Sequence, residues 1–129
     1  MPTETISVET DERLTCLDIT DRIASAVPER VDGTVTVFAQ HTTCGVTVNE
    51  AEPRLLGDIE DFLSALVADI GWAHDDIDDN ADAHLRASLV GPSVTIPAAD
   101  GKLHLGTWQS ILLVECDGPR RRSVSVTAD

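Results

Sequence analysis

The sequence predicts an α+β fold built on antiparallel sheets, with the element order β-β-α-β-β-α-β-β-β. Short segments towards both ends of the chain alternate polar and apolar residues and are rich in Val, Ile and Thr, as strands are. Between them, the segment that begins at Pro53 repeats its apolar residues with a period near 3.6, which predicts a long helix. Because the 129 residues contain no linker or repeat, we expect residues 1–129 to form a single domain.

The N-terminal part predicts a hairpin followed by a helix. Residues 4–9 and 13–18 alternate polar and apolar side chains on either side of the turn-prone residues 10–12, which is typical of an antiparallel hairpin. A short helix is expected over 19–27, because apolar residues recur there every four positions and Pro28 follows.

The middle of the chain predicts two strands and the principal helix. Residues 34–40 and 46–50 are rich in β-branched residues and enclose a tight connection over 41–45. Pro53 suits the first turn of a helix, where its missing N–H costs nothing, and the apolar period continues to Val67. The Asp-rich stretch 74–82 then predicts an exposed or ligand-facing loop.

The C-terminal part predicts a short helix and further strands. The helix is expected over 81–89, and the strand-like runs cover 93–97, 102–109, 110–116 and 122–128. Residues 111–114 form an unbroken apolar run, so both faces of that strand should be covered. With only two principal helices, a neighbouring subunit is a candidate cover, and dissociation would then expose apolar strands.

Charge excludes some functions. The 9 Lys and Arg face 23 Asp and Glu, which gives a net charge of −14, so nucleic acids and anionic membranes are disfavoured as partners. An apolar fraction of 42% argues against disorder. One Lys, no Tyr and the acidic excess are typical of proteins from salt-loving organisms.

No bilayer-spanning run or signal peptide is apparent, so we expect a cytoplasmic protein.

Cysteines and common motifs point to no familiar chemistry. Cys16, Cys44 and Cys116 are odd in number and lack CxxC spacing, which disfavours a disulfide framework or a zinc knuckle. The sequence contains no GxGxxG, P-loop, HExxH or GxSxG motif.

Histidines are the first candidates for a site. His41 follows a strand at the rim of a sheet, while His74 and His84 bracket the acidic loop; imidazoles there could ligate a metal, move a proton or simply be solvated. His104 should point outward from its strand. Glu50 ends another strand.

Glu115 lies within the apolar run, so it must either be neutral or have a partner, for which Arg120 or Arg122 is nearest in sequence. The cluster at 120–122 could instead hold a phosphate.

Several motifs stand in order along the chain: His41-Thr42-Thr43-Cys44-Gly45-Val46-Thr47-Val48-Asn49-Glu50, His74, Asn80 to Ser93, Asp100-Gly101, and Leu105-Gly106-Thr107-Trp108-Gln109. Together they resemble the YjbQ family, also called the secondary thiamine-phosphate synthase enzyme family. The resemblance implies a trimeric β-sandwich and a weak transferase activity that joins a pyrimidine diphosphate to a thiazole phosphate with release of pyrophosphate. The site positions it implies are His41, Glu50, His74, Asn80, Asp82, His84 and Gln109.

The resemblance leaves two functions open. As an enzyme, the chain would bind phosphorylated heterocycles, with His41, His74 and His84 holding zinc or magnesium, or the phosphates directly, and Glu50 or Asp82 acting as base. As a non-catalytic accessory protein, it would only capture a phosphorylated metabolite or a metal ion. The sequence departs from the family at Cys44, for which we expect packing rather than catalysis. It also departs at Ala51 and His104.

Overall fold

Two antiparallel sheets form the frame of the molecule. They come from a computed structural model that describes residues 3–129, and together with the helices they confirm the α+β class. One sheet has the strand order β1-β8-β3-β5-β6 and the other β2-β7-β4. The strands are β1 (Thr3–Glu9), β2 (Thr15–Asp18), β3 (Gly33–Ala39), β4 (Cys44–Asn49), β5 (Ser93–Ala99), β6 (Lys102–Leu103), β7 (Ser110–Glu115) and β8 (Arg121–Ala128).

The main core lies between the two sheets. Alternate residues of β3 and β8 face inward, and Val35, Val37 and Val124 are fully buried. Ile111 and Leu113 of β7 meet them from the other sheet. The period of two that marked these segments as strands therefore also supplies the apolar face that holds the sandwich together.

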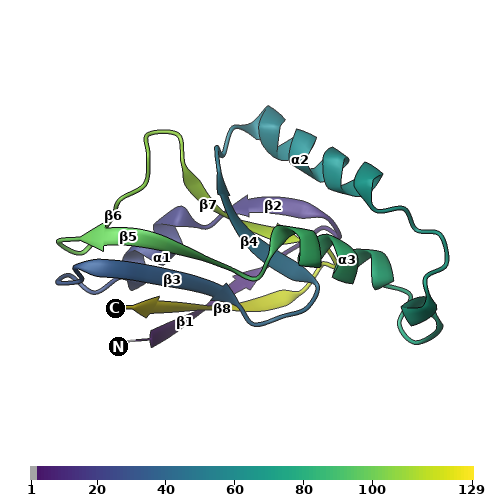
Figure 1. Cartoon of the computed structure of the whole chain (residues 1–129), viewed down its shortest axis with the longest axis horizontal. Coiled ribbons are helices and arrows are strands. Elements are labelled where there is room, and N and C mark those ends of the chain that lie inside the picture. The colour runs from purple at the N-terminus through teal and green to yellow at the C-terminus, as the bar shows by residue number, and fades with distance from the viewer. Residues whose placement is uncertain (1–2) are drawn as a thin grey trace.

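Three helices surround the smaller sheet. The helices are α1 (Thr20–Ala26), α2 (Pro53–Leu66) and α3 (Ala81–Val90), and the 3₁₀ turn η1 (Ala73–Asp76) precedes α3. In Figure 1, α2 and α3 lie on the side of β4 and β7 that faces away from the larger sheet. Leu63 of α2 and Ala83 of α3 form a second core with Val114. No helix within residues 3–129 is long and apolar enough to cross a bilayer.

Strand β7 is covered on both faces within one chain. Residues 111–114 are fully buried, as their unbroken apolar run predicts. The main core covers one face and the second core under α2 and α3 covers the other. A neighbouring subunit is therefore not needed to explain this strand.

The expected N-terminal hairpin is wrong. β1 pairs with β8 in the larger sheet, where Val8 lies opposite Arg122, whereas β2 pairs with β7 in the smaller sheet, where Cys16 lies opposite Val114. The turn between them carries the chain from one sheet to the other. Alternation looks the same in both sheets, so it does not reveal which strand is the partner.

The strand expected over 102–109 is also shorter than predicted. Only Lys102 and Leu103 pair with β5. Gln109 closes a turn with Gly106, because the backbone N–H of Gln109 donates to the Gly106 carbonyl at 3.0 Å. The chain leaves the larger sheet at this turn and enters β7.

Candidate functional site

A cleft of about 430 Å³ lies where the chain passes from β3 to β4, beside α3. We call it the histidine cleft, because His41 and His84 both line it although they are far apart in sequence. Its lining residues are His41, Thr42, Cys44, His84, Ala87, Ser88 and Pro92.

Close backbone contact brings α3 over the cleft. The N–H of Val46 donates to the carbonyl of Gly91, directly after α3, at 2.9 Å. A Cβ atom on Gly45 would lie only 2.5 Å from that same oxygen, so a side chain there would push the helix end away from β4. Gly91 itself has a φ of 91°, a conformation that favours glycine.

His41 is held by the backbone. Its Nε2 accepts a hydrogen bond from the N–H of Ser123 at 2.8 Å, so in the neutral ring the proton lies on Nδ1. Burial lowers the pKa of His41 and the charge of Arg122 lowers it further; Glu115 opposes this shift without reversing it. His41 is therefore a neutral ring whose Nδ1–H can donate to a ligand.

His74 and His84 form a pair beside the cleft. Their rings meet edge to face, with centroids 4.7 Å apart. Nε2 of His74 is buried without a hydrogen-bond partner among residues 3–129, and the nearest carboxylate oxygen, from Asp78, is 4.0 Å away. The three predicted histidines thus gather in one region.

Both carboxylate oxygens of Asp82 are already hydrogen-bonded to arginines. Its oxygens accept from Arg13 at 2.9 and 3.1 Å and from Arg86 at 2.8 Å. The hydrogen bonds from Arg13, with those from Arg86, lower the pKa of Asp82 to about 2. The expected role of Asp82 as a base or metal partner does not fit this arrangement, because both oxygens already hold a buried ion pair.

Asn80 joins the same region. Its Nδ2 donates to Asp117 at 2.9 Å, while its buried Oδ1 has no hydrogen-bond partner in the part of the chain that the structure describes.

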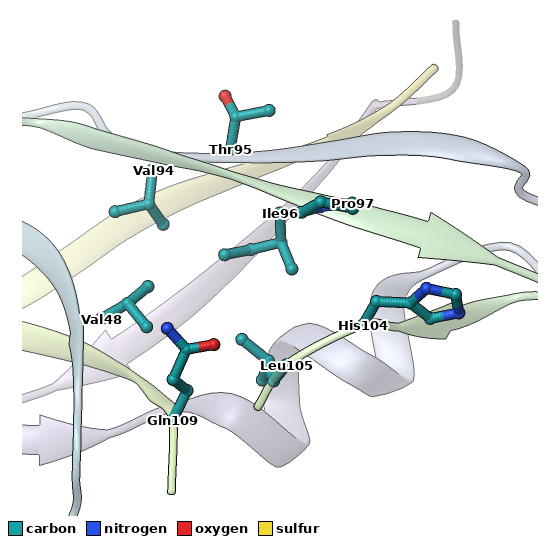
Figure 2. Close-up of a pocket in the computed structure, with 8 residues that line it drawn as sticks. All are labelled: Val48, Val94, Thr95, Ile96, Pro97, His104, Leu105 and Gln109. Atoms are coloured by element: carbon teal, nitrogen blue, oxygen red, sulfur yellow. The ribbon is translucent and has the colours of Figure 1, made fainter. Parts of the chain in front are cut away.

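Glu50 and Gln109 lie at the other end of β4. Glu50 borders a shallow hollow beside Trp108, and Gln109 lines a cleft between the sheets (Figure 2). The strand from Cys44 to Asn49 separates them from the histidine cleft by about 17 Å. Within one chain, the predicted site residues therefore fall into two groups.

The histidines do not fit the expected metal site. Metal binding through Nε2 of His41 would break its hydrogen bond to Ser123, and binding through Nδ1 would place two N–H donors face to face. Among residues 3–129, only one group of three or more His, Cys, Asp or Glu side chains has its ligand atoms within 4.8 Å of one another, namely Asp69, Asp75 and Asp79. Asp75 in that group already accepts from the amides of Trp72 and Ala81.

Cys44 packs rather than reacts. It is buried, and burial raises the pKa of its thiol to about 11, so the thiol stays protonated at neutral pH.

Thr42 and Ser88 line the cleft but were not predicted from the sequence. Ser88 could have been found, because it stands four residues after His84 and so shares a face of α3.

A buried ion pair supports the floor of the cleft. Glu115 and Arg122, which are 0% and 2% exposed, pair within the chain; of the two arginines that the sequence offered as partners, Arg122 is the one that binds Glu115. Arg122 also donates to the hydroxyl of Thr43 at 2.9 Å. Burial raises the pKa of Glu115, but its hydrogen bonds, first that from Arg122, outweigh this and hold the pKa below its usual range.

The chain is similar in sequence to proteins of the UPF0047 group. The chain is similar to a UPF0047 protein of Archaeoglobus fulgidus, at 48% identity over 95% of this chain and 98% of the relative. It is also similar to the UPF0047 protein YugU of Bacillus subtilis, at 33% identity over 93% of each chain.

Solved structures agree with the fold. A hypothetical protein of Aeropyrum pernix superposes with a TM-score of 0.95 at 44% identity, over 100% of this chain and 98% of that one. A YjbQ/UPF0047 protein of Clostridium acetobutylicum gives 0.90 at 40% identity, over 98% and 99%. The family model described as UPF0047 protein YjbQ-like matches residues 4–128. The chain therefore belongs to the YjbQ-like UPF0047 family.

Proposed function

We propose that the histidine cleft binds a phosphorylated small molecule. The observation that carries this proposal is the state of His41, a neutral ring with its Nδ1–H available and two arginines near enough to lower its pKa. In a chain with a net charge of −14, the cleft offers this donor beside the hydroxyls of Thr42 and Ser88 and has no carboxylate among its lining residues, so an anion meets little repulsion there. A cleft of about 430 Å³ is within the usual range for small ligands.

We propose that the reaction is the weak transfer that the family resemblance implies. A thiazole nitrogen attacks the methylene carbon of the pyrimidine diphosphate, and the carbon–oxygen bond breaks, with its electron pair leaving on pyrophosphate. No proton leaves the new bond, so the reaction needs no base, and the engagement of Asp82 does not oppose it. The N–H of His41 would stabilise the charge on the departing oxygens.

The test is product formation by purified protein, supplied with both heterocyclic phosphates at high salt. We expect His41→Ala and His84→Ala each to lose about a hundredfold in rate, the effect of removing one donor to a developing charge. His104→Ala is the matched control, because His104 lies outside the cleft and should retain full activity. Equal product from all four proteins would refute the assignment.

The second candidate is a non-catalytic binding protein. The observation that favours it is that, among the residues lining the histidine cleft, none is a carboxylate. Any joining of the two substrates would then come from proximity alone. Pyrophosphate binding in calorimetry without multiple turnover would favour this function over the enzymatic one.

We also propose a homotrimer assembled on the outer face of the larger sheet. Uncharged residues cover the middle of this face, with Glu9 and Arg121 paired at its margin, although the chain carries a net charge of −14. Copies of so acidic a protein repel each other least across such a face. The outward-facing residues include Thr5, Ser7, Thr34, Thr36, Phe38, Thr95, Ser123, Ser125 and Thr127.

A further inference from the structure

A second cleft, of about 360 Å³, lies between the edges of the two sheets, which we call the sheet-edge cleft. Figure 2 shows β5 above it, β4 beside it and the connection from His104 to Gln109 below it. Val48, Val94, Ile96 and Leu105 line it with apolar surface.

The cleft exists because β6 is short. The larger sheet loses its last strand after Leu103, where the chain turns away towards β7. No further strand covers β5 in the part of the chain that the structure describes, so Val94 and Leu105 remain partly exposed while they pack against the main core.

Gln109 supplies the polar group of this cleft. Its Oε1 accepts from the N–H of Gly106 at 2.8 Å, which fixes the orientation of the amide. Its Nε2 then lies on the Val48 side of the amide (Figure 2), whereas the ring of His104 points away. The turn that ends the strand early thus also aims a hydrogen-bond donor into an apolar space.

We propose that the sheet-edge cleft binds an uncharged, flat aromatic ring that accepts a hydrogen bond from Nε2 of Gln109. No Asp, Glu, Lys or Arg is among its lining residues and the ring of His104 points away from it, so a phosphate would find no permanent cation there. One fixed donor among apolar walls suits a heteroaromatic ring with a nitrogen or carbonyl acceptor. Val48 lies about 13 Å along β4 from Cys44, so this site is separate from the histidine cleft and independent of the proposed function.

The test uses two probes of one shape, quinoline and naphthalene, of which only quinoline has an acceptor nitrogen. Each is titrated into the ¹⁵N-labelled protein at high salt while amide signals are followed. We expect saturable quinoline shifts at Val48, Ile96 and the Gln109 side chain, with about five- to tenfold weaker binding of naphthalene. Equal affinity for both probes, or quinoline shifts confined to other residues, overturns the proposal.

Two variants locate the site. Gln109→Met removes the amide at similar length, and we expect it to reduce quinoline affinity to that of naphthalene. Gln40→Met, the same change outside this cleft, should leave the affinity unchanged. Val48→Phe keeps the amide but fills the space, so it should abolish binding of both probes. Undiminished quinoline binding by either cleft variant contradicts the proposal.

Discussion

His41 shows how a single residue restricts the chemistry of a site. Its Nε2 is committed to the backbone of Ser123, so the ring is a donor at Nδ1 rather than a metal ligand or a base. The same hydrogen bond joins the end of β3 to β8. A change at this residue therefore affects both the ligand and the local structure.

We predict that His41 remains neutral at a pH where an ordinary histidine is charged. Its pKa is lowered from 6.5, so the unfolded chain binds the proton more tightly and folding stability rises with pH through this interval. The contribution of His41 is lost as the pH falls below about 6.5. Long-range ¹H–¹⁵N spectra recorded below pH 6.5 should show the neutral Nδ1–H tautomer of His41 where a free imidazole is protonated; a charged ring or an Nε2–H tautomer there would contradict the prediction.

Asp82 gives a second pH dependence, with a different window. Its pKa of about 2 lies below the ordinary value of 3.8, so its stabilising effect is full above pH 4 and is lost as the pH falls towards 2. Asp82→Asn should cost about 3–5 kcal/mol in urea unfolding at pH 7, because Arg86 would keep a buried, uncompensated charge. Asp58→Asn, on the exposed face of α2, is the control and should change stability by less than about 0.5 kcal/mol.

The sequence could place Asp82 on a helix but could not give its partner. Arg13 is 69 residues away, and nothing in its neighbourhood distinguishes it from other arginines. The acidic surroundings of Asp82 suggested ligand chemistry, whereas tertiary contacts make it structural. His41 and His84 were brought together only by the family resemblance, since periodicity does not show that α3 crosses β4.

At the level of elements, the pair Glu115–Arg122 connects β7 to β8 across the two sheets. We expect Glu115→Gln to lower the free energy of unfolding by about 3–5 kcal/mol, since Arg122 would lose its buried counter-ion. Glu9→Gln is a matched control, because Glu9 and Arg121 pair on the exposed surface and should contribute less than about 1 kcal/mol. Similar losses for the two variants in urea titrations would argue against a special role for the buried pair.

Most elements could be predicted from the sequence, but their partners could not. The helix begun by Pro53 and the strand through residues 111–114 follow from periods that local sequence contains. The pairing of β1 with β8 joins residues more than a hundred positions apart, and alternation carries no information on it. A turn signal after residue 9 shows that the chain reverses, not that it changes sheets.

For the whole molecule, we predict that Thr36→Asp converts the proposed trimer into a folded monomer. Thr36 lies on β3 in the middle of the outer face, where a carboxylate from each copy would be brought together. The monomer should keep its circular dichroism spectrum, because β7 is covered within one chain. Light scattering at molar salt gives the mass, and Thr107→Asp, outside this face, should leave it unchanged. A wild-type mass of one subunit would contradict the trimer.

Salt is the second test at this scale. With a net charge of −14, carboxylate repulsion destabilises the compact chain unless ions screen it. We expect the folded fraction to fall when salt is dialysed from molar to millimolar concentration, as followed by circular dichroism. A constant folded fraction would remove the argument for adaptation to high salt.

The position of β8 sets the order in which the chain can mature on the ribosome. β8 lies between β1 and β3, so β1 has no partner in the larger sheet and one edge of β3 stays unpaired until residues 121–128 have been synthesised. Until then, the facing edges of β1 and β3 stay exposed in the nascent chain, because their shared partner is synthesised about 80 residues after β3. Premature termination anywhere before residue 121 should therefore release a sticky, protease-sensitive product rather than a smaller version of the fold.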